Sequence, residues 1–151
     1  MRKLAYACGA GVLTLAVAVT AIRAQDAGAR ARAPLTVKEV MEKTITPATN
    51  TLWNVPEAPT DEQWLALEEA AVTLLVAANV IAEGGAGPMD ALWARDPAWQ
   101  AYDRAMIEAG NAALTAVRGR NATALASAGD LLYPPCEGCH KQFNPALTDT
   151  Q

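Results

Sequence analysis

The sequence predicts an all-α protein, and more specifically an antiparallel, up-down-up-down four-helix bundle. Alanine is abundant, aromatic residues make up only 5% of the chain, and β-branched runs are scarce, which favours helices over a sandwich or barrel. Apolar residues recur at three- and four-residue steps in four segments of roughly 18 to 23 residues, joined by mostly short links. The competing all-α arrangement is an irregular globin-like packing, which would use more and shorter helices.

Composition narrows the class of protein further. The chain has 151 residues, 52% of them hydrophobic and 19% charged, with a formal net charge of −4. The length suits a single domain, and the apolar content excludes general disorder. There is no excess of basic residues to neutralise phosphates, so no nucleic-acid partner is expected.

Residues 1–24 have the layout of a secretory signal peptide. A basic start, MRK, precedes an uncharged stretch from Leu4 to Ile22, and a cut after Ala24 fits the small and apolar residues before it. The alternative is an uncleaved anchor, because 19 helical residues span about 28 Å. We therefore expect a periplasmic protein that contacts the membrane only if this segment is retained.

Removal of the signal leaves residues 25–34 as a flexible lead and residues 35–147 as the folded domain. The mature chain then holds 9 basic and 16 acidic side chains, a net charge of −7, because the three charged residues in the removed segment are all basic. Its only cysteines are Cys136 and Cys139, which would sit in an oxidising compartment.

The first predicted helix begins at Thr36, which forms a capping box with Glu39. An apolar stripe follows as far as Trp53, and Pro47 should bend the helix locally because it removes one backbone donor. Residues 54–59, which contain two prolines, form a loop.

The second helix opens at Thr60 with the same capping chemistry and stops at Gly84-Gly85. Residues 86–95 form a longer connection. Asp96-Pro97 then starts the third helix, with a capping side chain followed by proline in the first turn, and this helix closes at Gly119.

Asn121 caps a fourth helical segment that runs to Leu132. We expect Tyr133-Pro134-Pro135 to interrupt it, because proline lacks a backbone donor and restricts the residue before it. A further helical turn or two should run from Cys136 to about Phe143.

Residues 136–140, CEGCH, form the motif in the sequence that indicates a specific chemical function. They fit C-x-x-C-H, the attachment pattern for c-type haem. Two thiols one helical turn apart can add to the two vinyl groups on one edge of a porphyrin, and the imidazole of His140 can then reach the iron. A zinc site would need two more ligands, yet the mature chain offers no other Cys or His, and a redox dithiol would follow a strand. The motif therefore predicts one covalent haem c, held by Cys136 and Cys139, with His140 as an iron ligand.

A helical chain with CEGCH near its C-terminus, followed by Lys141-Gln142-Phe143, resembles the cytochrome c′ and cytochrome c-556 family over residues 35–145. The resemblance implies a four-helix bundle with the haem between helices at one end, often as a homodimer. It also implies that Cys136 and Cys139 form the thioethers and that His140 is the proximal ligand. Pro134-Pro135 departs from the family, whose members usually continue the helix there.

The second axial position of the iron is expected to be filled by Met41. Up-down-up-down topology brings the end of the fourth helix beside the start of the first. By resemblance, Met41 occupies the position from which low-spin c-556 members supply a methionine and c′ members present an apolar residue. Met89, on the 86–95 connection, is the main rival ligand, and Met106 lies farther along the third helix; filling of core space is the alternative role for Met41. The same topology also collects other parts of the chain at this end: Val80, Ile81, the 86–95 connection, Trp99 and Tyr102.

We therefore expect an exported mono-haem c-type cytochrome that transfers single electrons with low-spin, His/Met-ligated iron. Its partners would be redox proteins. No catalytic acid–base pair or phosphate-binding loop is visible in the sequence, because the only His is the expected iron ligand. The first alternative is a five-coordinate haem protein that binds nitric oxide or carbon monoxide, with Met41 as an apolar lid. The second is a haem-free exported interaction domain.

Overall fold

The structure is a computed structural model that describes residues 35–144. Of these residues 79% are helical and none lies in a strand, so the predicted all-α class is confirmed. The expected signal peptide (1–24), the expected flexible lead (25–34) and the last residues of the expected domain (145–147) lie outside the described residues. The described part forms five helices when the first three labelled elements are taken as one continuous segment.

The first segment consists of α2 (Val37–Val40), η1 (Met41–Ile45) and α3 (Thr46–Trp53). It begins as predicted, with a capping box. The backbone N–H of Glu39 donates to Oγ1 of Thr36 at 3.1 Å, and the backbone N–H of Thr36 donates to the Glu39 carboxylate at 2.8 Å. Two of the unpaired donors at the helix start are thus satisfied.

Element η1 is a π-helix, which the sequence did not predict. The N–H of Thr46 donates to the carbonyl of Met41, five residues earlier. Pro47 gives a physical reason, because in a regular α-helix its ring would clash with the carbonyl four residues before it. The wide turn also keeps Val40 and Ile45, five positions apart, on one buried face at 4% exposure each. A regular helix would turn them to different sides.

The next two long helices are α4 (Asp61–Ala82) and α6 (Pro97–Arg118), and their predicted caps are confirmed. Thr60 accepts from the N–H of Gln63, and Asp96 accepts from the N–H of Ala98. The connection between them contains a short helix that the sequence did not predict, α5 (Asp90–Trp93).

Helix α7 (Ala122–Phe143) begins at its predicted cap, Asn121, but the predicted interruption at Tyr133-Pro134-Pro135 is wrong. The helix runs through both prolines. Pro134 and Pro135 would have bonded the carbonyls of Asp130 and Leu131, and both of these residues are exposed, so water can take the place of the missing donors. Pro135 is buried on the side that carries Leu132, which is 1% exposed, and packing of this face favours continuation.

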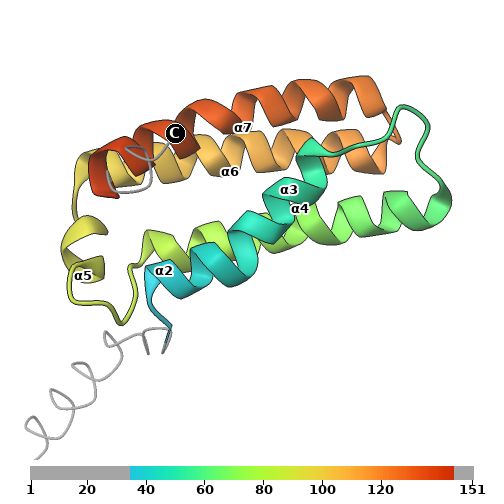
Figure 1. The fold of residues 1–151 in the computed structure, drawn as a ribbon. Helices are drawn as coiled ribbons and strands as arrows, with labels where there is room; N and C mark the ends of the chain where they lie inside the picture. Colours follow the sequence, from blue (N-terminus) through green and yellow to red (C-terminus); the bar gives the residue numbers. More distant parts are fainter. Residues whose placement is uncertain (1–34, 145–151) are drawn as a thin grey trace, which may run out of the picture. The chain divides into compact units, whose positions relative to one another are not determined.

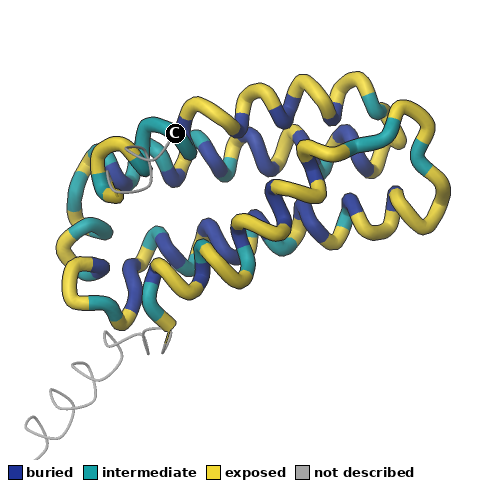
Figure 2. The backbone as a smooth tube through the Cα atoms, in the orientation of Figure 1, coloured by how far each residue is buried: buried dark blue, intermediate teal, exposed yellow. Residues whose placement is uncertain are grey.

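The long helices pack through small and branched side chains. Helix α6 lies against both α4 and α7, and α3 contacts α4 and α7. The α3–α4 link and the α6–α7 turn are at one end, while α5 is at the other (Figure 1). Buried and exposed positions alternate along each long helix (Figure 2). Four large side chains are completely enclosed: Leu52, Leu74, Leu125 and Leu132.

A buried carboxylate ties the start of α2 to the connection after α4. Asp90 is 4% exposed, and its Oδ2 accepts hydrogen bonds from the N–H of Val37 at 2.8 Å and of Gly87 at 2.9 Å. A Cβ on Gly85 would come within 2.5 Å of the same oxygen, so only glycine fits there. This clamp sets the start of the helical segment that carries Met41.

Candidate functional site

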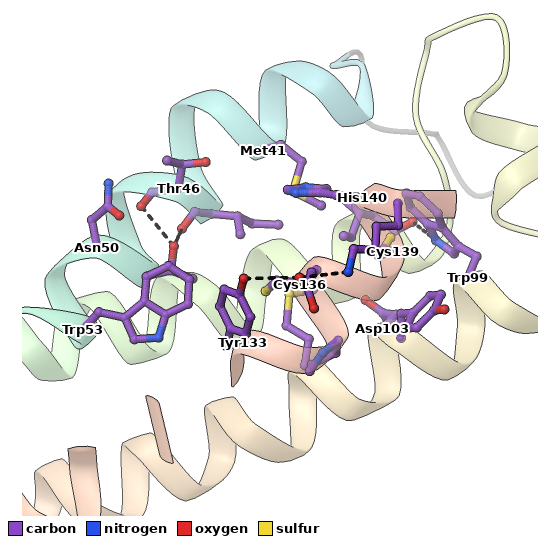
Figure 3. Close-up of a pocket in the computed structure, with 18 residues that line it drawn as sticks. Met41, Thr46, Asn50, Trp53, Trp99, Asp103, Tyr133, Cys136, Cys139 and His140 are labelled. Atoms are coloured by element: carbon purple, nitrogen blue, oxygen red, sulfur yellow. Dashed lines mark hydrogen bonds and ion pairs between the residues drawn. The ribbon is translucent and has the colours of Figure 1, made fainter. Parts of the chain in front are cut away.

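A cavity of about 420 Å³ lies among η1, α3, α6 and α7, and it contains most of the predicted motif (Figure 3). This volume falls within the range of about 300–1,000 Å³ that is usual for small-molecule and cofactor sites. The lining combines apolar and aromatic side chains with a few polar ones: Met41, Ile45, Thr46, Thr49, Asn50, Trp53, Ile81, Trp99, Tyr102, Asp103, Met106, Tyr133, Pro135, Cys136, Glu137, Cys139, His140 and Lys141.

The two motif cysteines, Cys136 and Cys139, line this cavity from positions about one turn apart on α7. Both are half-buried and neither is in a disulfide. Burial raises the pKa of the Cys136 thiol to about 11 and, together with the charges of Cys136 and Asp103, that of the Cys139 thiol to about 12. Reactive dithiols instead have a lowered pKa, often at a helix N-terminus, whereas these lie in the last turns of a 22-residue helix. The site is therefore poorly suited to dithiol redox chemistry.

His140 follows Cys139 directly and also lines the cavity. Burial lowers its pKa, which favours the neutral imidazole with a lone pair free for a metal. Met41 extends into the cavity from η1 toward His140 on α7 (Figure 3). Within residues 35–144, no group of three or more His, Cys, Asp or Glu side chains could hold a metal ion.

Gly138, between the two cysteines, is in close contact with Tyr102 on α6. A Cβ on Gly138 would lie 2.6 Å from Cε1 and 3.2 Å from the hydroxyl oxygen of Tyr102. A larger residue would therefore displace the ring that packs against the motif. The other intervening residue, Glu137, pairs with Lys141 at 2.9 Å on the partly exposed side of α7.

Aromatic side chains pack around Trp99, which lines the cavity on the side of α5. Trp99 is 3% exposed, donates from Nε1 to the carbonyl of Ile81 at 3.1 Å, and stacks on Trp93 with ring centroids 5.8 Å apart. Phe143 meets Trp99 edge-on at 5.2 Å. Trp53 lines another part of the cavity and donates from Nε1 to the carbonyl of Gly129 at 3.0 Å.

The structure brings together most of the side chains that topology predicted for this end. Met41, Ile81, Trp99 and Tyr102 all line the cavity. Val80 packs against the core instead, and no residue of the 86–95 connection is among the lining residues.

The candidate methionines are placed differently from the expected ranking. Met41 and Met106 both line the cavity, and Met106 is 5% exposed. Met89 is 43% exposed and is not among the lining residues. The two methionines beside the cavity are therefore Met41 and Met106, and Met89 is not one of them.

Asp103 also lines the cavity, and the sequence did not predict it there. It is 5% exposed and lies on α6 between two other buried lining residues, Trp99 and Met106. The steps of four and three residues put all three on one helix face. A carboxylate in the middle of an apolar stripe was the signal that could have revealed it.

Comparisons of the chain with protein-family models, with curated proteins and with solved structures found no match. What the protein does is therefore inferred from the cavity, the motif that lines it and the chemistry of their side chains.

Proposed function

We propose that the cavity holds one haem c and that the protein is an exported cytochrome that transfers single electrons. Cys136 and Cys139 would hold the ring through thioether bonds, and His140 would ligate the iron. The observation that carries this proposal is that both cysteines and the histidine of C-x-x-C-H line one cavity of about 420 Å³, with a methionine entering from the facing segment. When bound, the haem supplies an iron that gains and loses one electron.

The side chains of the cavity fit such a group. Burial strongly disfavours a thiolate at Cys136 and Cys139, but a thioether carries no charge, so the same burial suits covalent attachment. His140 is held neutral, as a metal ligand must be. Much of the lining is apolar, and such surroundings would raise the energy of the more highly charged oxidised iron and favour the reduced state.

We propose that Met41 would supply the second protein ligand of the iron. It comes from the segment that faces α7, it is half-buried, and η1 and the Asp90 clamp fix the backbone on either side of it. A thioether ligand in addition to histidine would favour reduced iron and raise the reduction potential. Because both ligands would come from the folded chain, the protein would need little rearrangement on gain or loss of an electron.

The arrangement of the helices supports the finer fold that the sequence predicts. We propose that the α2–α3 segment, α4, α6 and α7 form an antiparallel four-helix bundle like that of the cytochrome c′ and c-556 family. The contacts of α6 with α4 and α7, and of α3 with α4 and α7, support this topology. The proposal includes a periplasmic location and redox proteins as partners. It also includes a homodimer, for which α4 offers three outward apolar residues: Leu65, Val72 and Val76.

Absorption spectra of the oxidised and reduced protein test the ligand set. The mature protein, produced with a haem-attachment system, should give a low-spin spectrum with a weak band toward the red from sulfur–iron bonding. Met41→Ala should become high-spin and bind carbon monoxide rapidly, whereas Met89→Ala, a matched loss of methionine outside the cavity, should leave the spectrum unchanged. A high-spin wild-type protein would instead indicate the gas-binding alternative. An unchanged low-spin spectrum in Met41→Ala would move the ligand elsewhere, with Met106 the next residue to replace.

A further inference from the structure

One buried polar atom at the cavity has no hydrogen-bond partner. Among the side-chain nitrogens and oxygens of residues 35–144, Oδ1 of Asp103 alone is both fully buried and unpaired. Buried carboxylate oxygens are nearly always hydrogen-bonded, because an unpaired charge away from water is costly. An exception beside a cofactor cavity therefore requires a functional explanation.

The surroundings of Asp103 make it sensitive to charge in the cavity. Its neighbours include Cys139, whose thiol pKa is raised by the Asp103 charge, so the carboxyl lies near one of the two attachment points. The other titratable or charged groups that line the cavity or act on Asp103 come from two helices. On α6 they are Tyr102 and Arg104, and on α7 they are Tyr133, Cys136, Glu137, His140 and Lys141. The lining residues contributed by η1, α3 and α4 carry no charge.

Burial raises the pKa of Asp103 to about 6, and the positive charge of Arg104 opposes the shift only in part. A carboxyl of this kind exchanges its proton close to neutral pH, whereas an exposed aspartate stays ionised. When protonated, it can also donate the hydrogen bond that its carboxylate form cannot make.

We propose that Asp103 is a redox-linked proton site: it takes up one proton from solvent when the site gains an electron and releases it when the electron leaves. This inference rests on the proposed function. The electron comes from a one-electron donor protein and then passes to an acceptor protein. The proton moves between water and a carboxylate oxygen of Asp103, and no bond to the cofactor forms or breaks.

The coupling follows from electrostatics in a water-poor cavity. Gain of an electron lowers the net charge of the site by one, which makes a nearby buried carboxylate less favourable and favours its protonated form. Linkage is reciprocal, so protonation of Asp103 in turn favours reduction. The protein would then transfer a proton together with the electron in the pH range where the oxidised form is deprotonated and the reduced form is protonated.

The test is the midpoint reduction potential of the haem-loaded protein, measured from about pH 5 to about pH 8. The wild-type potential should fall as pH rises, with a slope that approaches 59 mV for each tenfold change in proton concentration. Asp103→Asn should lose most of this slope. Asp130→Asn, the same chemical change at an exposed position of α7, should retain it. Equal slopes in wild type and Asp103→Asn, or no slope in wild type, would overturn the inference.

A second measurement needs no variant. The infrared difference spectrum between reduced and oxidised wild-type protein should show a carbonyl band of a protonated carboxyl that grows on reduction and shifts when the aspartates are labelled with carbon-13. Absence of a shifting band would also overturn the inference. Failure of the proposed function looks different, because a protein without covalent haem would have no haem potential to measure. A haem-loaded protein with a slope independent of Asp103 would overturn this inference alone.

Discussion

Replacement of Asp90 by alanine tests how the first helical segment is anchored. Oδ2 of Asp90 is the acceptor for the N–H groups of Val37 and Gly87, and Asp90 is 4% exposed. Loss of the partner costs about 1–3 kcal/mol for the buried N–H of Val37 and about 1–2 kcal/mol for the partly buried N–H of Gly87, so Asp90→Ala should lower the free energy of unfolding by about 2–5 kcal/mol. At about 4 °C per kcal/mol, the Tm should fall by roughly 8–20 °C.

Asp90→Asn separates the hydrogen bonds from the charge. Its amide oxygen can accept both bonds in the same place, and because hydrogen bonds to charged groups are stronger by about 1 kcal/mol each, the loss should be about 2 kcal/mol. Unfolding of the mature protein in urea, followed by far-ultraviolet circular dichroism, gives the free energies. Asp130→Ala, an exposed control, should change stability by about 0.5 kcal/mol or less. A loss below about 1 kcal/mol for Asp90→Ala, or equal losses for both Asp90 variants, would refute the reasoning.

Three further predictions concern the site and the core. Gly138→Val should cost about 1–3 kcal/mol because of the clash with Tyr102, and the double variant with Tyr102→Ala should show a smaller cost for the same change; equal costs in both backgrounds would contradict the contact. Leu125→Ala, at 0% exposure, should cost about 2–5 kcal/mol, whereas Leu131→Ala on the same helix, at 62% exposure, should cost about 0.5 kcal/mol or less in the same urea titration. Burial raises the pKa of Asp103 from 3.8 to about 6, so protonation of Asp103 stabilises the folded haem-free chain below about pH 4 relative to neutral pH. This contribution is lost as pH rises through about 6. The free energy of unfolding of Asp103→Asn should therefore rise relative to that of wild type by up to about 3 kcal/mol between pH 4 and pH 7. A difference in unfolding free energy that stays constant over this range would contradict the prediction.

The helix starts could be predicted because their signals are local. Thr36 and Thr60 each form a capping box with a residue three positions later, and Asp96 and Asn121 accept from nearby backbone donors. Such contacts depend on a few neighbouring residues and not on the rest of the fold.

The errors arise where packing outweighs local preference. Pro135 disfavours helix locally, yet α7 continues because its buried face packs and the carbonyls left without donors belong to exposed residues. Pro47 was expected to bend the first helix, but the π-turn of η1 could not be foreseen, because it also depends on burying Val40 and Ile45 together.

At the site, too, local sequence features could be predicted and contacts between distant residues could not. Cys136, Cys139 and His140 are adjacent in sequence, so their shared position on the cavity follows from the motif. One of the two hydrogen-bond donors to Asp90 is the N–H of Val37, 53 residues away, and no local pattern indicates it. Asp103 could have been recognised as a charge within an apolar stripe, but the lack of a partner for its oxygen becomes visible only in the folded chain.

The central claim is that two sulfurs of α7 hold a porphyrin. The most direct measurement is the intact mass of the mature protein after production with a haem-attachment system, compared with a Cys136→Ala/Cys139→Ala variant made in the same way. The wild-type protein should carry the added mass of one haem after denaturation, and the variant should carry none. A wild-type mass equal to that of the bare polypeptide would contradict the proposal.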